Sequence, residues 1–204
     1  MKYEDIESQL DTGDLILFQQ NWWLGNLISY FTASEYSHCG VIVRDPQFGP
    51  EPLKGLYLLE STAFEGVEDV EDHEIKNGVQ LRSFKEVYDS CVGHLYWRKL
   101  ECARTRTFYH KLNSVHSIIH NKPYDVYPND WVKAKFNLQK GNIKRTDRFL
   151  CSALCSFVYI GLGLLPLDIN WTIITPAELG TEVNSDGQKV GFINCIMNKE
   201  TLIK

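Results

Sequence analysis

The chain has 204 residues, of which 44% are hydrophobic and 12% aromatic, and its formal net charge is -5. This composition predicts one globular domain with a sizeable core and excludes a disordered chain. The negative charge, without any nucleic-acid-binding motif, excludes a protein that neutralises phosphates, because such proteins need a basic face. No nucleic acid partner is therefore expected.

The cysteines and the N-terminus bear on the compartment. The six cysteines lack the paired spacing of a disulfide framework, which indicates free thiols in a reducing compartment. The first residues are acidic where a signal peptide would be basic and then apolar, and no uncharged apolar run reaches the ~18 residues of a spanning helix. We expect a soluble, cytoplasmic protein, with peripheral membrane contact left open.

The first half of the chain predicts strands. After a turn at Gly13-Asp14, continuous or alternating apolar runs predict strands at 15–18, 40–43, 56–60, 78–82 and 93–98. Between the first two, residues 22–31 predict a short aromatic helix. Its adjacent Trp22 and Trp23 favour core packing over a patch that faces lipid or ligand.

The second half predicts helices. Four apolar residues at i, i+4, i+7 and i+11 predict an amphipathic helix over 103–120: Phe108, Leu112, Val115 and Ile119. The same spacing of Leu150, Leu154, Phe157 and Gly161 predicts a buried helix, with Thr146 and Asp147 as capping residues. Further elements are a helix start at Thr175 and strands near 190–193. Strands followed by helices indicate an α+β fold with a largely antiparallel sheet packed against helices.

Cys151 is the first candidate for chemistry. It follows the predicted helix start by about one turn, where free N–H groups and the helix dipole favour a thiolate. The structural alternative is that Cys151 and Cys155 are small core residues, because free cysteine is among the most buried residue types.

A thiol nucleophile needs a base and an acceptor that orients the base. His38 precedes the strand 40–43, and Glu60 ends the strand 56–60. Neighbouring strands present side chains about 5 Å apart, so His38 and Glu60 could meet at one sheet edge. A cysteine helix packed across that edge would complete a Cys151–His38–Glu60 triad.

Five motifs in order resemble one family. They are Gly13-Asp14-Leu-Ile-Leu-Phe, Tyr36-Ser37-His38-Cys-Gly40, Leu59-Glu60 with Glu65-Gly66-Val67, Pro123-Tyr124-Asp125, and Phe149-Leu-Cys151-Ser152. Together they resemble the circularly permuted branch of the NlpC-type papain-like superfamily, the YiiX-like proteins of bacteria with relatives in large DNA viruses. The resemblance covers roughly residues 11–180, so we expect one permuted papain-like domain over 1–204 with a C-terminal extension over 181–204.

The resemblance implies a catalytic set and a reaction. Position by position, the family's cysteine falls on Cys151, at a helix N-terminus, its histidine on His38 and its acidic partner on Glu60. The implied activity is that of a thiol hydrolase that cleaves a peptide or other amide bond through an acyl-enzyme, without metal or organic cofactor. Four residues of the matched motifs are candidates for lining the oxyanion or the substrate: Tyr36, Ser37, Ser152 and Tyr124. The family commonly has Cys-Ser-Glu where this chain has Cys151-Ser152-Ala153.

Two other functions remain open. The same triad could act on lipid esters as a phospholipase or acyltransferase, for which Trp22-Trp23 would supply a lipid-facing patch. A binding or virion-associated module that has lost turnover is the alternative of another class, and Ala153 is its sequence support. If the protein is viral, the host cytoplasm or the virion replaces the cytoplasm as its location. The sequence does not indicate an oligomeric state.

The remaining candidates favour structural roles. His116 and His120 have the i, i+4 spacing of a metal pair, but without a third ligand of suitable spacing a solvated helix face is preferred. Cys39 points to the other side of its strand from His38, so core packing is expected. The acidic run 68–74 favours a solvated loop, Asp14 favours an anchor for the first turn, and Glu65 is a less rigidly placed rival of Glu60.

Overall fold

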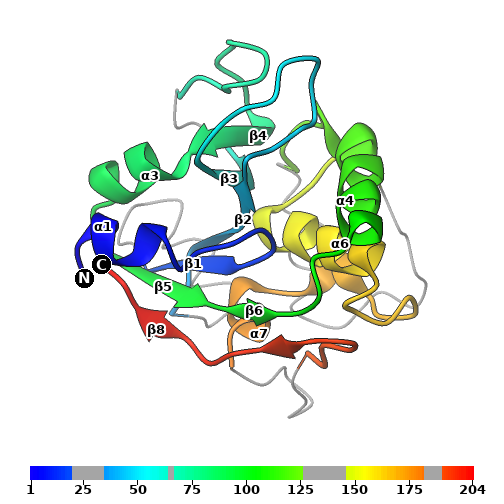
Figure 1. The fold of residues 1–204 in the computed structure, drawn as a ribbon. Coiled ribbons are helices and arrows are strands. Elements are labelled where there is room, and N and C mark those ends of the chain that lie inside the picture. The colour runs from blue at the N-terminus through cyan, green and yellow to red at the C-terminus, as the bar shows by residue number, and fades with distance from the viewer. Residues whose placement is uncertain (20–34, 64–66, 126–145, 182–189) are drawn as a thin grey trace.

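A six-stranded antiparallel sheet lies at the centre of the molecule (Figure 1). The computed structural model describes residues 1–19, 35–63, 67–125, 146–181 and 190–204. The strand order is β4-β3-β2-β1-β5-β8, with bounds β1 Leu15–Gln19, β2 His38–Arg44, β3 Leu56–Thr62, β4 Gly78–Ser83, β5 His94–Arg98 and β8 Thr201–Leu202. A two-stranded sheet pairs β6 (Leu100–Glu101) with β7 (Ile196–Met197). The predicted α+β class with an antiparallel sheet is confirmed.

Helices cover both faces of the large sheet. One face packs against α4 (Arg106–Ile119) and α6 (Cys151–Leu162), and the other packs against α1 (Tyr3–Glu7) and α3 (Phe84–Ser90) (Figure 1). Strand β1 shows the alternation: Leu15 and Leu17 belong to the core under α4 and α6, whereas Ile16 and Phe18 belong to the other core. Because both faces are buried, the strand reads as a continuous apolar run.

The predicted helix over 103–120 is α4. It begins at Arg106, where the hydroxyl of Thr105 accepts a hydrogen bond from the Phe108 N–H at 3.3 Å. All four residues of its predicted apolar face are buried: Phe108, Leu112, Val115 and Ile119. Helix α4 contacts α6 closely at Gly161, where a Cβ atom would lie 2.1 Å from Cγ2 of Val115. Glycine at this position therefore sets how near the two helices can approach.

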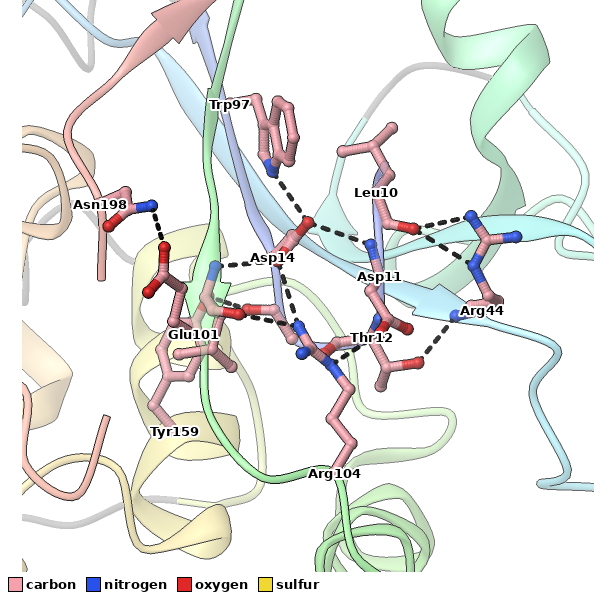
Figure 2. A network of polar contacts seen from close by, with 12 residues as sticks. Leu10, Asp11, Thr12, Asp14, Arg44, Trp97, Glu101, Arg104, Tyr159 and Asn198 are labelled. Atoms are coloured by element: carbon pink, nitrogen blue, oxygen red, sulfur yellow. Dashed lines mark hydrogen bonds and ion pairs between the residues drawn. The ribbon is translucent and has the colours of Figure 1, made fainter. Parts of the chain in front are cut away.

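The turn before β1 is held by Asp14, as predicted for an anchor (Figure 2). Its carboxylate is fully buried. Four groups surround it: Trp97 Nε1 at 2.8 Å, Leu100 N at 2.9 Å, Asp11 N at 3.0 Å and Arg104 Nη2 at 3.3 Å. The hydroxyl of Tyr159 donates to the Gly13 carbonyl at 2.9 Å and so ties α6 to the same turn. These bonds fix the cysteine helix relative to the first strand.

The C-terminal part of the chain joins the sheets. Two short helices follow α6: η1 (Trp171–Ile173) and α7 (Pro176–Leu179). The predicted helix start at Thr175 is the N-cap of α7, which forms a capping box with Glu178. The expected strand near 190–193 is wrong: this segment is irregular, because Ile193 donates to the Leu164 carbonyl and Phe192 packs on Tyr159. Strand β8, within the predicted extension, pairs with β5.

Some expectations fall elsewhere. The predicted helix 22–31 and Glu65 lie outside the described residues. Within the described part of the chain, no helix combines the length and the apolar character needed to cross a membrane.

Candidate active site

Helix α6 starts at Cys151 itself. Its N-cap is Leu150, in an extended conformation, so the predicted capping by Thr146 or Asp147 is wrong. The reason is a long-range contact: Phe149 forms an isolated parallel bridge with Tyr124, and its carbonyl accepts the Ser61 hydroxyl at 2.8 Å. A backbone held extended at Phe149 cannot begin a helix there.

This start changes the surroundings of Cys151. It is the first residue of the helix rather than one turn inside, and the apolar side chain of Leu150 cannot cap the first-turn N–H groups. Among the described residues, no N-cap side chain competes for this end of the helix, and the positive end of the helix dipole favours negative charge on the sulfur of Cys151.

The structure brings His38 and Glu60 together. His38 is the first residue of β2, and Glu60 of β3 lies opposite Gly40, so both side chains point to the same face of the sheet. Nε2 of His38 lies 2.6 Å from Oε2 of Glu60. The side chain of His38 is near enough to Cys151 for each to shift the pKa of the other. Because Nε2 is hydrogen-bonded to Glu60, a proton exchanged with the sulfur would have to pass through Nδ1.

Two residues of β4 hold the second oxygen of Glu60. Arg82 Nη1 lies 3.1 Å and Gln80 Nε2 lies 3.3 Å from Glu60 Oε1. Glu60 is 1% exposed, so its charge is balanced inside the protein by Arg82 as well as by His38. Neither residue was predicted as part of the site. Both alternate with Val79 and Leu81 along a buried strand, and a polar side chain in such a strand needs a buried hydrogen-bond partner.

Cys39 lies against Cys151. The burial of Cys39 confirms the expected core packing. Its side chain points to the face of the sheet that is covered by α6. Its thiol and its backbone lie near enough to the sulfur of Cys151 to lower the pKa of that thiol, and its own pKa is raised by burial, Cys151 and Cys155. Cys39 is thus part of the surroundings of the candidate nucleophile, which alternation along the strand alone did not reveal.

The charges at the site favour an ion pair. The hydrogen bond from Cys39 lowers the pKa of Cys151 most; burial opposes it, and the hydrogen bond and charge of His38 bring the pKa well below that of an ordinary thiol. Burial alone would lower the pKa of His38, but hydrogen bonds to Cys151 and Glu60 raise it well above its usual value. Burial would raise the pKa of Glu60, and His38 and Arg82 lower it instead. A thiolate, an imidazolium and a carboxylate are therefore the favoured forms.

The sulfur is shielded from bulk water. Cys151 is 3% exposed, and the side chain of His38 is 12% exposed. A substrate carbonyl can reach this sulfur only when the groups that cover it move aside. Shielding also strengthens the attraction within the pair, because the effective dielectric constant is lower than in water.

The four candidate lining residues have different surroundings. The Ser37 hydroxyl donates to the Phe18 carbonyl at 3.2 Å, and the Tyr36 ring packs edge-on against Tyr96. Tyr124 belongs to the bridge that positions Phe149, two residues before Cys151. Ser152 is buried as the second residue of α6, where its backbone N–H lies in the uncapped first turn.

Comparisons with known proteins find similar solved structures. No protein-family model matches the chain, and no curated protein sequence matches it. Among solved structures, a similar chain is described as the "crystal structure of metalloprotein yiiX from Escherichia coli O157:H7, DUF1105". The likeness covers 96% of this chain and 97% of that chain, with 18% sequence identity and a TM-score of 0.49. Roles of individual residues in this chain therefore have to come from its own geometry.

Proposed function

We propose that this chain is a thiol hydrolase that cleaves an amide bond, with Cys151 as nucleophile, His38 as acid and base, and Glu60 as the group that orients His38. One observation carries the proposal: a largely shielded imidazole hydrogen-bonds to a buried carboxylate through one nitrogen, and a cysteine at a helix start lies near enough for imidazole and thiol to shift each other's pKa. Nucleophile, base and orienting acceptor in this order form the arrangement of a catalytic triad.

The reaction follows from these groups. The Cys151 thiolate attacks the carbonyl carbon of the substrate, and the oxyanion forms beside the first N–H groups of α6, those of Cys151 and Ser152. The protonated His38 then gives its proton to the leaving amine, and an acyl-enzyme remains on the sulfur. His38 next takes a proton from water, which attacks the thioester and releases the acid and the thiolate.

The proposal includes a permuted papain-like arrangement. His38 and Glu60 come from neighbouring strands in the first part of the chain, and Cys151 begins a helix 91 positions after Glu60. The motif resemblance supports the same residue assignment. The substrate that we propose is therefore a peptide or another amide.

The test is turnover by the full chain on matched libraries of peptide amides and of lipid esters. Wild type is expected to cleave amides, Cys151→Ala to be slower by roughly a thousandfold or more, and Cys155→Ala, which alters the thiol one turn on, to retain turnover. Cleavage of lipid esters alone, dependent on Cys151, would replace the amidase by the lipid-ester enzyme. Equal rates for wild type and Cys151→Ala, or no turnover on either library, would contradict a hydrolase.

A further inference from the structure

Three metal-binding side chains converge outside the candidate active site. His116 and His120 lie at the C-terminal end of α4, and Glu71 comes from the acidic loop that packs beside it. One ligand atom from each lies within 4.8 Å of the others, and His116 Nε2 lies 2.9 Å from Glu71 Oε2. The expected solvated helix face is therefore wrong for His116, which is 6% exposed, and the loop places a carboxylate near both histidines.

The side chains of this cluster are held in place by their neighbours. The ring of Phe48 stacks on the ring of His116, with centroids 3.8 Å apart and planes 5° apart. In the loop, the fully buried Asp69 accepts hydrogen bonds from the N–H of Glu71 at 2.7 Å and of Asp72 at 3.0 Å. The acidic loop is thus ordered around Asp69, and the Glu71 carboxylate is directed at the histidines.

One atom of the cluster lacks a hydrogen bond. Nε2 of His120 is buried and has no hydrogen-bond partner among the described residues, although Asp72 Oδ2 lies 3.1 Å away. That oxygen instead accepts a hydrogen bond from Lys76 Nζ at 2.6 Å. A buried imidazole nitrogen that makes no hydrogen bond is unfavourable, and a metal ion on its lone pair would satisfy it.

We propose that Glu71, His116 and His120 bind one zinc-class divalent ion. Two imidazoles and one carboxylate suit zinc, whereas calcium and magnesium prefer oxygen ligands alone. Zinc bonds of about 2.0–2.1 Å in a tetrahedron place ligand atoms about 3.3 Å apart. The observed separations lie between 2.9 Å and 4.8 Å, so side-chain adjustments on the order of 1 Å would complete the site.

The fourth coordination position remains for water. Asp72 is engaged by Lys76, and a cavity of about 210 Å³ opens beside Glu71 and Phe48. Three protein ligands with one open position are typical of zinc sites that activate water. The bound ion would also tie the acidic loop to the end of α4, so binding should stabilise the folded chain.

The test is titration of the metal-free full chain with Zn²⁺ against a chromophoric chelator. We expect one site per chain, at least ~100-fold weaker binding in His116→Asn and in Glu71→Gln, and a melting temperature that rises with Zn²⁺ in wild type. His73→Asn is the matched control: His73 is also a histidine of this loop, its side chain is 77% exposed, and asparagine tolerates its positive φ of 56°. This variant should bind as wild type does.

Cobalt distinguishes this site from the cysteine cluster. Co²⁺ at the proposed site should give visible bands without sulfur-to-cobalt charge transfer, because all ligands are nitrogen and oxygen. A charge-transfer band that disappears in Cys151→Ala would place the metal on the thiols and overturn the proposal. No stoichiometric binding, or unchanged binding in His116→Asn and in the more exposed variant His120→Asn, would overturn it as well. The outcome is independent of whether the chain hydrolyses amides.

Discussion

Replacement of His38 by asparagine is expected to lower amide turnover by roughly a thousandfold or more, because nucleophile and base act as a unit. Asparagine keeps a hydrogen-bond donor toward Glu60 but cannot take or give a proton. Without the imidazolium, the thiol of Cys151 also loses a hydrogen bond and a charge that lower its pKa. The alkylation of Cys151, measured by mass spectrometry at neutral pH, should slow together with turnover.

The matched control is His94→Asn, which changes an exposed histidine at the first residue of another strand of the same sheet. This variant should keep both rates. If His38→Asn alkylated Cys151 and turned over substrate as fast as His94→Asn, the role given to the imidazole would be wrong.

Replacement of Glu60 by alanine is expected to destabilise the fold as well as the site. The guanidinium of Arg82, whose side chain is only 9% exposed, would keep its charge and lose its ion pair with Glu60. Breaking a buried ion pair on one side costs about 3–5 kcal/mol, which for a chain of this length lowers the melting temperature by roughly 6–20 °C. Thermal unfolding followed by circular dichroism measures the shift.

Two further variants separate the charge from the contact. Glu60→Gln keeps the size of the side chain, removes the charge and replaces one of the two accepting oxygens by a donating NH2 group. The double variant Glu60→Ala with Arg82→Met also removes the guanidinium that has lost its Glu60 carboxylate, so it should recover part of the stability lost in Glu60→Ala. A change within about 0.5 kcal/mol for Glu60→Ala, the size typical of surface sites, would show that this carboxylate does not support the fold.

The same pair has a defined dependence on pH. The pKa of Glu60 is lowered on folding, so its contribution to stability is present above the unfolded value of about 4.3 and is lost as the pH falls through the folded pKa. The pKa of His38 is raised, so its contribution is present below about 6.5 and is lost as the pH rises through the folded pKa. Glu60 is one of the groups that raise the pKa of His38. In Glu60→Gln the loss of stability on the alkaline side should therefore occur at lower pH than in wild type.

Periodicity predicted the sheet and both long helices because these elements bury continuous apolar faces. It failed where a distant segment decides the local structure. The start of α6 depends on the bridge between Phe149 and Tyr124, and no residue beside Cys151 in the sequence indicates that bridge. Thr146 and Asp147 have good capping side chains, but the backbone between them and Cys151 is not free to turn.

The environments of the site residues show the same limit. A histidine and a carboxylate on adjacent strands could be predicted to meet, because strand spacing is fixed. The contacts of Arg82 with Glu60 and of Glu71 with His116 join segments more than twenty positions apart, through loops whose path the sequence does not specify. Such contacts became visible only with the fold.

The ionisation of Cys151 gives the most direct measurement of the central claim. The ultraviolet absorbance of the thiolate, taken as wild type minus Cys151→Ala across the pH range, reports this sulfur alone. Wild type should already show the thiolate well below the ordinary thiol pKa of about 8.5, and the sulfur in His38→Asn should titrate nearer to that ordinary value. A wild-type sulfur that titrates like an ordinary thiol, with no change in His38→Asn, would contradict the paired thiolate and imidazolium on which the hydrolase depends.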